Sequence, residues 1–205
     1  MKHGMRILLL AGILGTLSLV TGCGGKPGGT ARLTPVDRAG DLTQTFSQAY
    51  ITRGRAGEYD IILTDAAADW DYRQGKARKN KPLEPQPLAP LRQVMHIHLY
   101  WRPLLLTTKN PAAINASINW YVLGPDGSQE LQVYEGAAYV ALYGGGNHRT
   151  ISIRDGRISP KLQRGQIHDP IGTARITGRF GVVANDARVR ETINELQKQA
   201  ALARK

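Results

Sequence analysis

The segment Val94–Trp101 constrains the fold more than any other part of the chain. Its sequence, VMHIHLYW, places a large apolar residue at every second position. Successive side chains of a β-strand point to opposite faces, so Met95, Ile97 and Leu99 share one face. An amphipathic helix would instead repeat its apolar residues every three or four positions. The segment therefore predicts a strand with one face in the core.

Further segments rich in β-branched and aromatic residues lie between short runs of turn-forming residues. They are Thr45–Thr52, Tyr59–Thr64, Ala116–Leu123, Leu131–Tyr143, Thr150–Ile153 with Arg157–Ile158, and Ile171–Val183. We expect Gly136 to form a β-bulge and Asp155-Gly156 to form a two-residue hairpin turn. The run Gly144–Asn147 predicts another turn. These signals predict about seven strands with short connections, which favours an antiparallel sheet.

The end of the chain has a helical pattern. Asn185 or Asp186 can cap a helix, and one apolar stripe follows at helical spacing. The stripe consists of Val189, Ile193, Leu196 and Ala200. We therefore expect a C-terminal helix over residues 186–203. The predicted fold is mainly β: an antiparallel β-sandwich or curved sheet of about seven strands with that helix, in a single domain over residues 41–205.

The start of the chain carries a targeting pattern. Lys2 and Arg6 precede the apolar or small residues 7–20, a run too short for a spanning helix, which needs roughly 20 apolar residues. The run ends in LVTGC, with the cysteine at position 23. This segment resembles the lipobox of bacterial lipoproteins, in which small residues precede a cysteine that is acylated and becomes the new amino terminus. The resemblance implies a signal peptide over residues 1–22 and a lipid on Cys23.

Several expectations follow from that resemblance. Cys23 is the one cysteine of the chain, so the lipidated protein would have neither a disulfide nor a thiol nucleophile, and the covalent lipid is the only cofactor we expect. Loss of Lys2 and Arg6 would lower the formal net charge from +11 to +9. The resemblance places the protein in the cell envelope. Gly24, in place of an aspartate, favours the outer membrane over the inner membrane.

Two segments have the composition of exposed chain. Residues 23–40 are rich in glycine, proline and charge, and predict a flexible tether between the lipid and the domain. Residues 66–90 predict an exposed loop that is first basic and then proline-rich. Its basic residues are Arg73, Lys76, Arg78, Lys79 and Lys81. They are candidates for binding an anionic surface, and the alternative is a solvated loop whose charge serves solubility.

His96 and His98 are the candidate metal ligands. Residues two apart on a strand share a face, a spacing that metal-binding His-x-His pairs use. A metal site needs further ligands, and His148, His168 and Asp169 are candidates from elsewhere in the chain. The plainer interpretation is that both histidines belong to a half-exposed sheet face, and that is our expectation.

The sequence favours a binding protein over an enzyme. It contains neither the Gly-x-Ser-x-Gly nor the Ser-x-x-Lys pattern of serine nucleophiles, and no candidate catalytic residue. We expect a non-enzymatic envelope lipoprotein that binds a protein partner or helps to assemble an envelope complex. One alternative is a metal-binding protein or metal-dependent enzyme that uses His96 and His98. Another is a binder of anionic lipid or glycan, with an aromatic sheet face as the platform. Nucleic acid is not an expected partner outside the cytoplasm.

Overall fold

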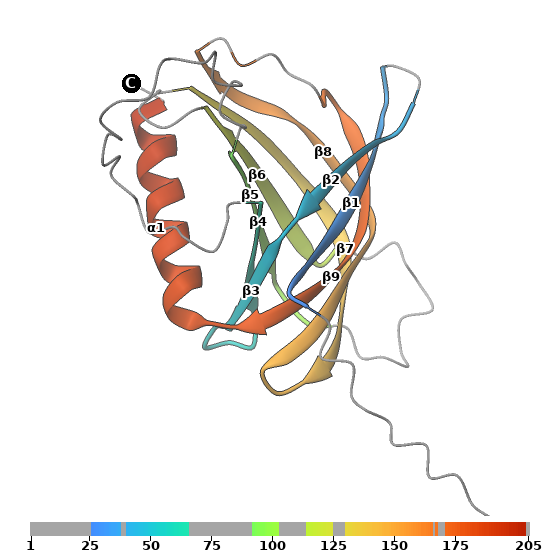
Figure 1. The fold of residues 1–205 in the computed structure, drawn as a ribbon, viewed down its shortest axis with the longest axis vertical. Helices are drawn as coiled ribbons and strands as arrows, with labels where there is room; N and C mark the ends of the chain where they lie inside the picture. The colour runs from blue at the N-terminus through green and yellow to red at the C-terminus, as the bar shows by residue number, and fades with distance from the viewer. Residues whose placement is uncertain are drawn as a thin grey trace, which may run out of the picture.

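The computed structural model describes residues 26–37, 40–65, 92–102, 114–124, 130–165, 167 and 171–203. They form one sheet of nine strands and one α-helix (Figure 1). The strands are β1 (Gly28–Pro35), β2 (Leu42–Phe46), β3 (Gln48–Arg53), β4 (Tyr59–Thr64), β5 (Arg92–Leu99), β6 (Ala116–Leu123), β7 (Leu131–Gly145), β8 (His148–Arg164) and β9 (Ala174–Ala184), and the helix is α1 (Asp186–Ala203). The predicted mainly β fold with a C-terminal helix is confirmed.

The sheet is strongly curved. Its strand order is β2-β1-β9-β3-β4-β5-β6-β7-β8, and β9 also pairs with β8. Every pairing is antiparallel except β3 with β9, which is parallel and covers two residue pairs. Strand β9 therefore has β8 along one edge and β1, then β3, along the other, as the curvature in Figure 1 shows. The curved-sheet alternative is confirmed, with nine strands rather than about seven, and the sandwich of two sheets is not found.

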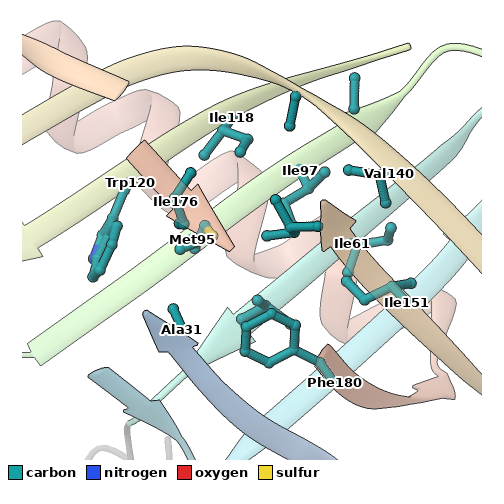
Figure 2. Packing of buried hydrophobic residues seen from close by; sticks show 14 of the residues in the cluster. Ala31, Ile61, Met95, Ile97, Ile118, Trp120, Val140, Ile151, Ile176 and Phe180 are labelled. Carbon is teal, nitrogen blue, oxygen red and sulfur yellow. The ribbon is translucent and has the colours of Figure 1, made fainter. Parts of the chain in front are cut away.

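The inner face of the sheet carries the main hydrophobic core (Figure 2). Trp120, Tyr134, Phe46 and Phe180 are its largest fully buried side chains. Phe46 lies 5.6 Å from Trp120 and 6.0 Å from Phe180 between ring centroids, in tilted and edge-on arrangements. Burial of each large apolar side chain stabilises the fold by roughly 1.5–3 kcal/mol. These side chains fill the inner face of the curved sheet.

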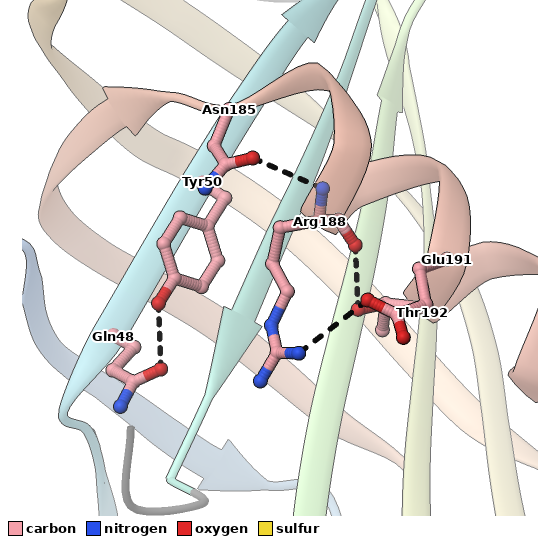
Figure 3. Close-up of polar contacts among 6 residues, drawn as sticks. All are labelled: Gln48, Tyr50, Asn185, Arg188, Glu191 and Thr192. Atoms are coloured by element: carbon pink, nitrogen blue, oxygen red, sulfur yellow. Dashed lines mark hydrogen bonds and ion pairs between the residues drawn. The ribbon is translucent and has the colours of Figure 1, made fainter. Parts of the chain in front are cut away.

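Helix α1 packs on the outer face of the sheet. Val189 and Leu196 are buried there in a second cluster that includes Ile62 and Val94. The helix begins with an N-cap, because the Asn185 Oδ1 accepts a hydrogen bond from the Arg188 backbone N–H at 3.0 Å (Figure 3). The predicted range 186–203 is confirmed. Among the described residues, no helix has the length and apolar character needed to cross a membrane.

The predicted tether over residues 23–40 is wrong for residues 28–35, which form β1. This strand pairs with β9 over its whole length and with β2 over five residue pairs. Ala31, Leu33 and Pro35 point inward and are buried. Alanine and proline are weak strand formers, so this alternation is hard to recognise from the residue types. The pairing with β9 determines the structure here, between residues that lie 139 (Pro35 and Ala174) to 153 (Gly28 and Gly181) positions apart in the chain.

The predicted hairpin at Asp155-Gly156 is also wrong. Strand β8 continues through both residues, and the register of its pairing with β9 shifts between Ile153 and Gly156. Pairing along both edges of β8 keeps the chain extended where a turn motif would otherwise reverse it. The predicted bulge at Gly136 is not found, since β7 shifts register at Val133/Tyr134 and Tyr139/Val140. The predicted loop 66–90 lies outside the described residues.

Candidate functional site

Three titratable side chains meet on the outer face of the sheet: Asp60 from β4, and His96 and His98 from β5. In the register of these two strands, Asp60 lies opposite His98 and Ile62 lies opposite His96. The residues that alternate with the histidines, Met95, Ile97 and Leu99, are fully buried in the inner core. The sequence prediction that the two histidines share the more exposed face is therefore confirmed.

One carboxylate oxygen joins the three side chains. His96 Nε2 lies 2.8 Å from Asp60 Oδ1, and His98 Nδ1 lies 2.8 Å from the same oxygen. The side chains are 16 % exposed for His96, 24 % for Asp60 and 32 % for His98, so water reaches one side of the group. One candidate ligand atom from each residue lies within 4.8 Å of the other two. We call these three residues the Asp60 cluster.

The electrostatics of the Asp60 cluster favour an ionised carboxylate. Burial raises the pKa of Asp60, but the hydrogen bonds from His96 and His98 and the positive charge of their protonated forms outweigh it. The net result is a pKa below the ordinary value of 3.8. An ionised carboxylate only accepts hydrogen bonds, so His96 Nε2 and His98 Nδ1 both carry a proton that points at Asp60 Oδ1.

Neighbouring residues limit the movement of the cluster. The Tyr100 ring packs edge-on against the His98 ring, with centroids 5.0 Å apart and an interplanar angle of 78°. The Tyr100 backbone N–H donates to the Asn115 carbonyl at 2.9 Å, which fixes the end of β5 against the start of β6. Opposite Asp60 on β3, the Thr52 hydroxyl donates to Asp186 Oδ1 at 2.5 Å, so the start of α1 is joined to the same part of the sheet.

The other predicted site residues lie elsewhere. His148 is exposed at the start of β8 and is not in the Asp60 cluster. His168 and Asp169 lie outside the described residues, as do Cys23 and the basic residues of the loop 66–90. The sequence analysis missed Asp60. Its one signal is a charged residue inside the strand sequence YDIILT, and only the pairing of β4 with β5 brings it between the histidines.

The aromatic residues of the strands do not form one platform. Trp120 and Tyr134 are fully buried in the inner core, and Tyr121 packs against the cluster under α1. Tyr100 and Trp101 are 50 % and 48 % exposed at the end of β5. Among the described residues, Tyr100 and Trp101 are the aromatic side chains with large exposed area, and their ring centroids lie 6.4 Å apart.

Chemically, the Asp60 cluster offers two imidazole nitrogens and one carboxylate oxygen around a single point. This donor set can hold a divalent metal ion, or it can remain a hydrogen-bonded group on the sheet. The sequence matches no protein-family model, and no curated protein or solved structure matches it.

Proposed function

We propose that the protein is a membrane-anchored cell-envelope lipoprotein, without catalytic activity, whose β-rich domain binds a protein partner. The observation that carries the proposal is the position of the lipobox-like cysteine relative to the fold. Strand β1 begins at Gly28, five residues after Cys23. Because an extended chain covers at most about 3.6 Å per residue, the link reaches no more than roughly 18 Å. A lipid on Cys23 would keep the domain at the membrane surface.

The end of the sheet from which this link starts can be identified from the strand register. Gly28 pairs with Gly181, Gly181 with Thr150, and Thr150 with Tyr143. The start of β1 therefore lies at the end of the sheet that carries the β7–β8 turn (Figure 1). Arg102 reaches the same place, because its Nη2 donates to the Gly144 carbonyl at 3.2 Å.

This end of the sheet suits an anionic bilayer surface, and we call it the anchor end. Among the described residues, it carries the exposed large apolar side chains of Tyr100, Trp101 and Ile114. Arg102 is exposed beside them, and the Arg149 guanidinium lies 5.3 Å from the centroid of the Tyr59 ring. Tyrosine and tryptophan favour the boundary between water and hydrocarbon. Each arginine near an anionic surface contributes about 1 kcal/mol to binding.

The partner is proposed to be a protein that meets the outer surface. The inner face of the curved sheet is filled by the buried aromatic and aliphatic side chains of the main core. A lipid or glycan on the concave face would have to displace that core, at a cost of several kcal/mol. The outer face presents polar strand residues beside α1, and the anchor end would be directed to the membrane. A protein partner would therefore bind the surface away from the anchor end.

The anchoring step is tested by Cys23→Ser, with Ser18→Ala in the same apolar run as the matched control. The wild type and the two variants are expressed in a bacterial host that is fed an alkyne-tagged fatty acid. We expect label in the wild type and in Ser18→Ala, and none in Cys23→Ser, which should also keep residues 1–22 and migrate as a larger species. Label on Cys23→Ser, or a mature mass equal to that of the wild type, would contradict the proposal.

Partner binding is tested separately, by cross-linking the lipidated protein in the envelope of its own host before solubilisation. We expect one envelope protein to be cross-linked in a constant ratio, through residues away from the anchor end. Recovery of the uncross-linked monomer alone, from membranes in which the protein is lipidated, would contradict the binding function and leave the anchor proposal intact.

A further inference from the structure

We propose that Asp60, His96 and His98 bind one divalent first-row transition metal ion, with zinc as the reference ion. The inference concerns a site that the anchoring and partner-binding proposal does not use. It rests on three features of the Asp60 cluster: the convergence of its ligand atoms, the rigidity of the strands that carry it, and the chemistry of its donors.

The ligand atoms already surround a common point. Zinc binds imidazole nitrogen at about 2.0–2.1 Å and carboxylate oxygen at about 2.0–2.2 Å, so tetrahedral ligand atoms lie about 3.3 Å apart. In the structure the two nitrogen–oxygen distances are 2.8 Å, and all three atoms lie within 4.8 Å of one another. A metal ion would bind His96 Nε2 and His98 Nδ1 in place of the two protons that now point at Asp60 Oδ1. These protons leave to solvent, and each neutral imidazole keeps its proton on the other ring nitrogen. The required movements are a few tenths of an ångström to about 1 Å, within the range of side-chain rotation.

The backbone beneath the cluster is fixed on both sides. Strand β4 is paired with β3 and β5, and β5 is paired with β4 and β6. The inward-facing neighbours Ile61 and Ile97 are fully buried in the main core. The edge-on contact with Tyr100 restricts the ring of His98, which is the more exposed of the two histidines. Ligands on paired strands therefore lose little freedom when an ion binds.

The donors select a class of ion. Two imidazoles and one carboxylate suit zinc, iron, cobalt, nickel or copper, whereas calcium and magnesium require mostly oxygen ligands. The carboxylate offsets part of the charge of the ion. Because the three side chains are 16–32 % exposed, one side of the site is open, and a water molecule can complete the coordination. The site thus resembles the three-ligand arrangement that leaves a position for an exchangeable ligand.

The experiment uses the full lipidated protein, purified in detergent, stripped with a chelator and then titrated with Zn²⁺, Co²⁺ and Mg²⁺. We expect one Zn²⁺ or Co²⁺ per chain, visible absorption from four-coordinate cobalt, and no Mg²⁺ binding. Loss of an outer-sphere partner weakens metal binding by about 10- to 100-fold. Because His96→Gln removes a ligand itself, it should weaken Zn²⁺ binding by more than about 100-fold. Asp60→Asn should weaken it by at least about tenfold.

His148→Gln is the matched control, because His148 is an exposed histidine outside the cluster. This substitution should leave the affinity and stoichiometry of Zn²⁺ binding unchanged. Thermal unfolding of each metal-free variant shows whether it is folded, and His98→Gln replaces His96→Gln if the latter is not. The proposal is overturned if the wild type binds no stoichiometric Zn²⁺, if Asp60→Asn binds as the wild type does, or if His148→Gln loses as much affinity as the cluster variants. In each of these cases the three residues form a hydrogen-bonded group and no metal site.

Discussion

Gly136 lies at a close approach between β7 and β8. A Cβ at this position would lie 1.8 Å from the Arg157 carbonyl oxygen, which no side chain can tolerate without a shift of the backbone. The glycine pairs in regular register with Ile118 on one side and Ile158 on the other. The residue is therefore needed for a close approach between strands and not for a bulge.

Gly136→Ala is expected to lower the free energy of unfolding by about 2–4 kcal/mol, because overpacking forces β7 and β8 apart. Gly145→Ala, on the same strand, is the matched control: nothing lies within 4 Å of its Cβ position, so its effect should stay within about 0.5 kcal/mol. Urea unfolding of both variants measures the difference. Equal stability of the two variants would show that β7 and β8 do not approach each other as described.

Asp60 gives the metal-free protein a pH dependence whose sign follows from its pKa. The folded-state pKa lies below the ordinary 3.8, so the carboxylate adds stability that is fully present above about pH 4 and is lost as pH falls through the lowered value. In chelator, Asp60→Asn should therefore be less stable than the wild type at pH 6, and the difference should shrink toward pH 2. Asp155→Asn, at an exposed carboxylate of β8, is the control. A difference that grows as pH falls would contradict the assigned contacts.

The sequence predicts α1 more completely than any strand pairing, because a helix is determined by nearby residues. Its cap at Asn185 and its apolar stripe lie within one segment of the chain. Strands β4 and β6 also match their predicted ranges, because β4 is a short apolar run and buried residues alternate with half-buried ones along most of β6. Strands β1 and β8 do not match their predicted structure, because their extended form depends on pairing with β9. No local sequence pattern indicates that pairing.

The packing of α1 is tested at Leu196, which is 2 % exposed in the outer cluster. Leu196→Ala should lower the free energy of unfolding by about 2–5 kcal/mol, through lost burial and the remaining cavity. Leu202→Ala is the matched control on the same helix, because Leu202 is 53 % exposed and the substitution keeps its carbonyl oxygen, which accepts a hydrogen bond from Arg164 Nη1. Its effect should stay within about 0.5 kcal/mol. Similar losses in both variants would mean that α1 does not pack on the sheet through this stripe.

Across the whole molecule, the curved sheet separates three regions. The inner face holds the main core, the outer face holds α1 and the Asp60 cluster, and the anchor end lies next to the start of β1. The sequence was sufficient to predict the fold class and two of the three cluster residues. It could not supply the strand order, nor Asp60, because both depend on which strands become neighbours in space.

The proposed function depends on the lipid at Cys23, so the most direct measurement is mass spectrometry of the amino-terminal peptide of the protein purified from its own envelope. The account predicts a chain that begins at Cys23 and carries a diacylglycerol on the sulfur, with residues 1–22 removed. A peptide that begins at Met1, or at any residue other than Cys23 without lipid, would contradict it.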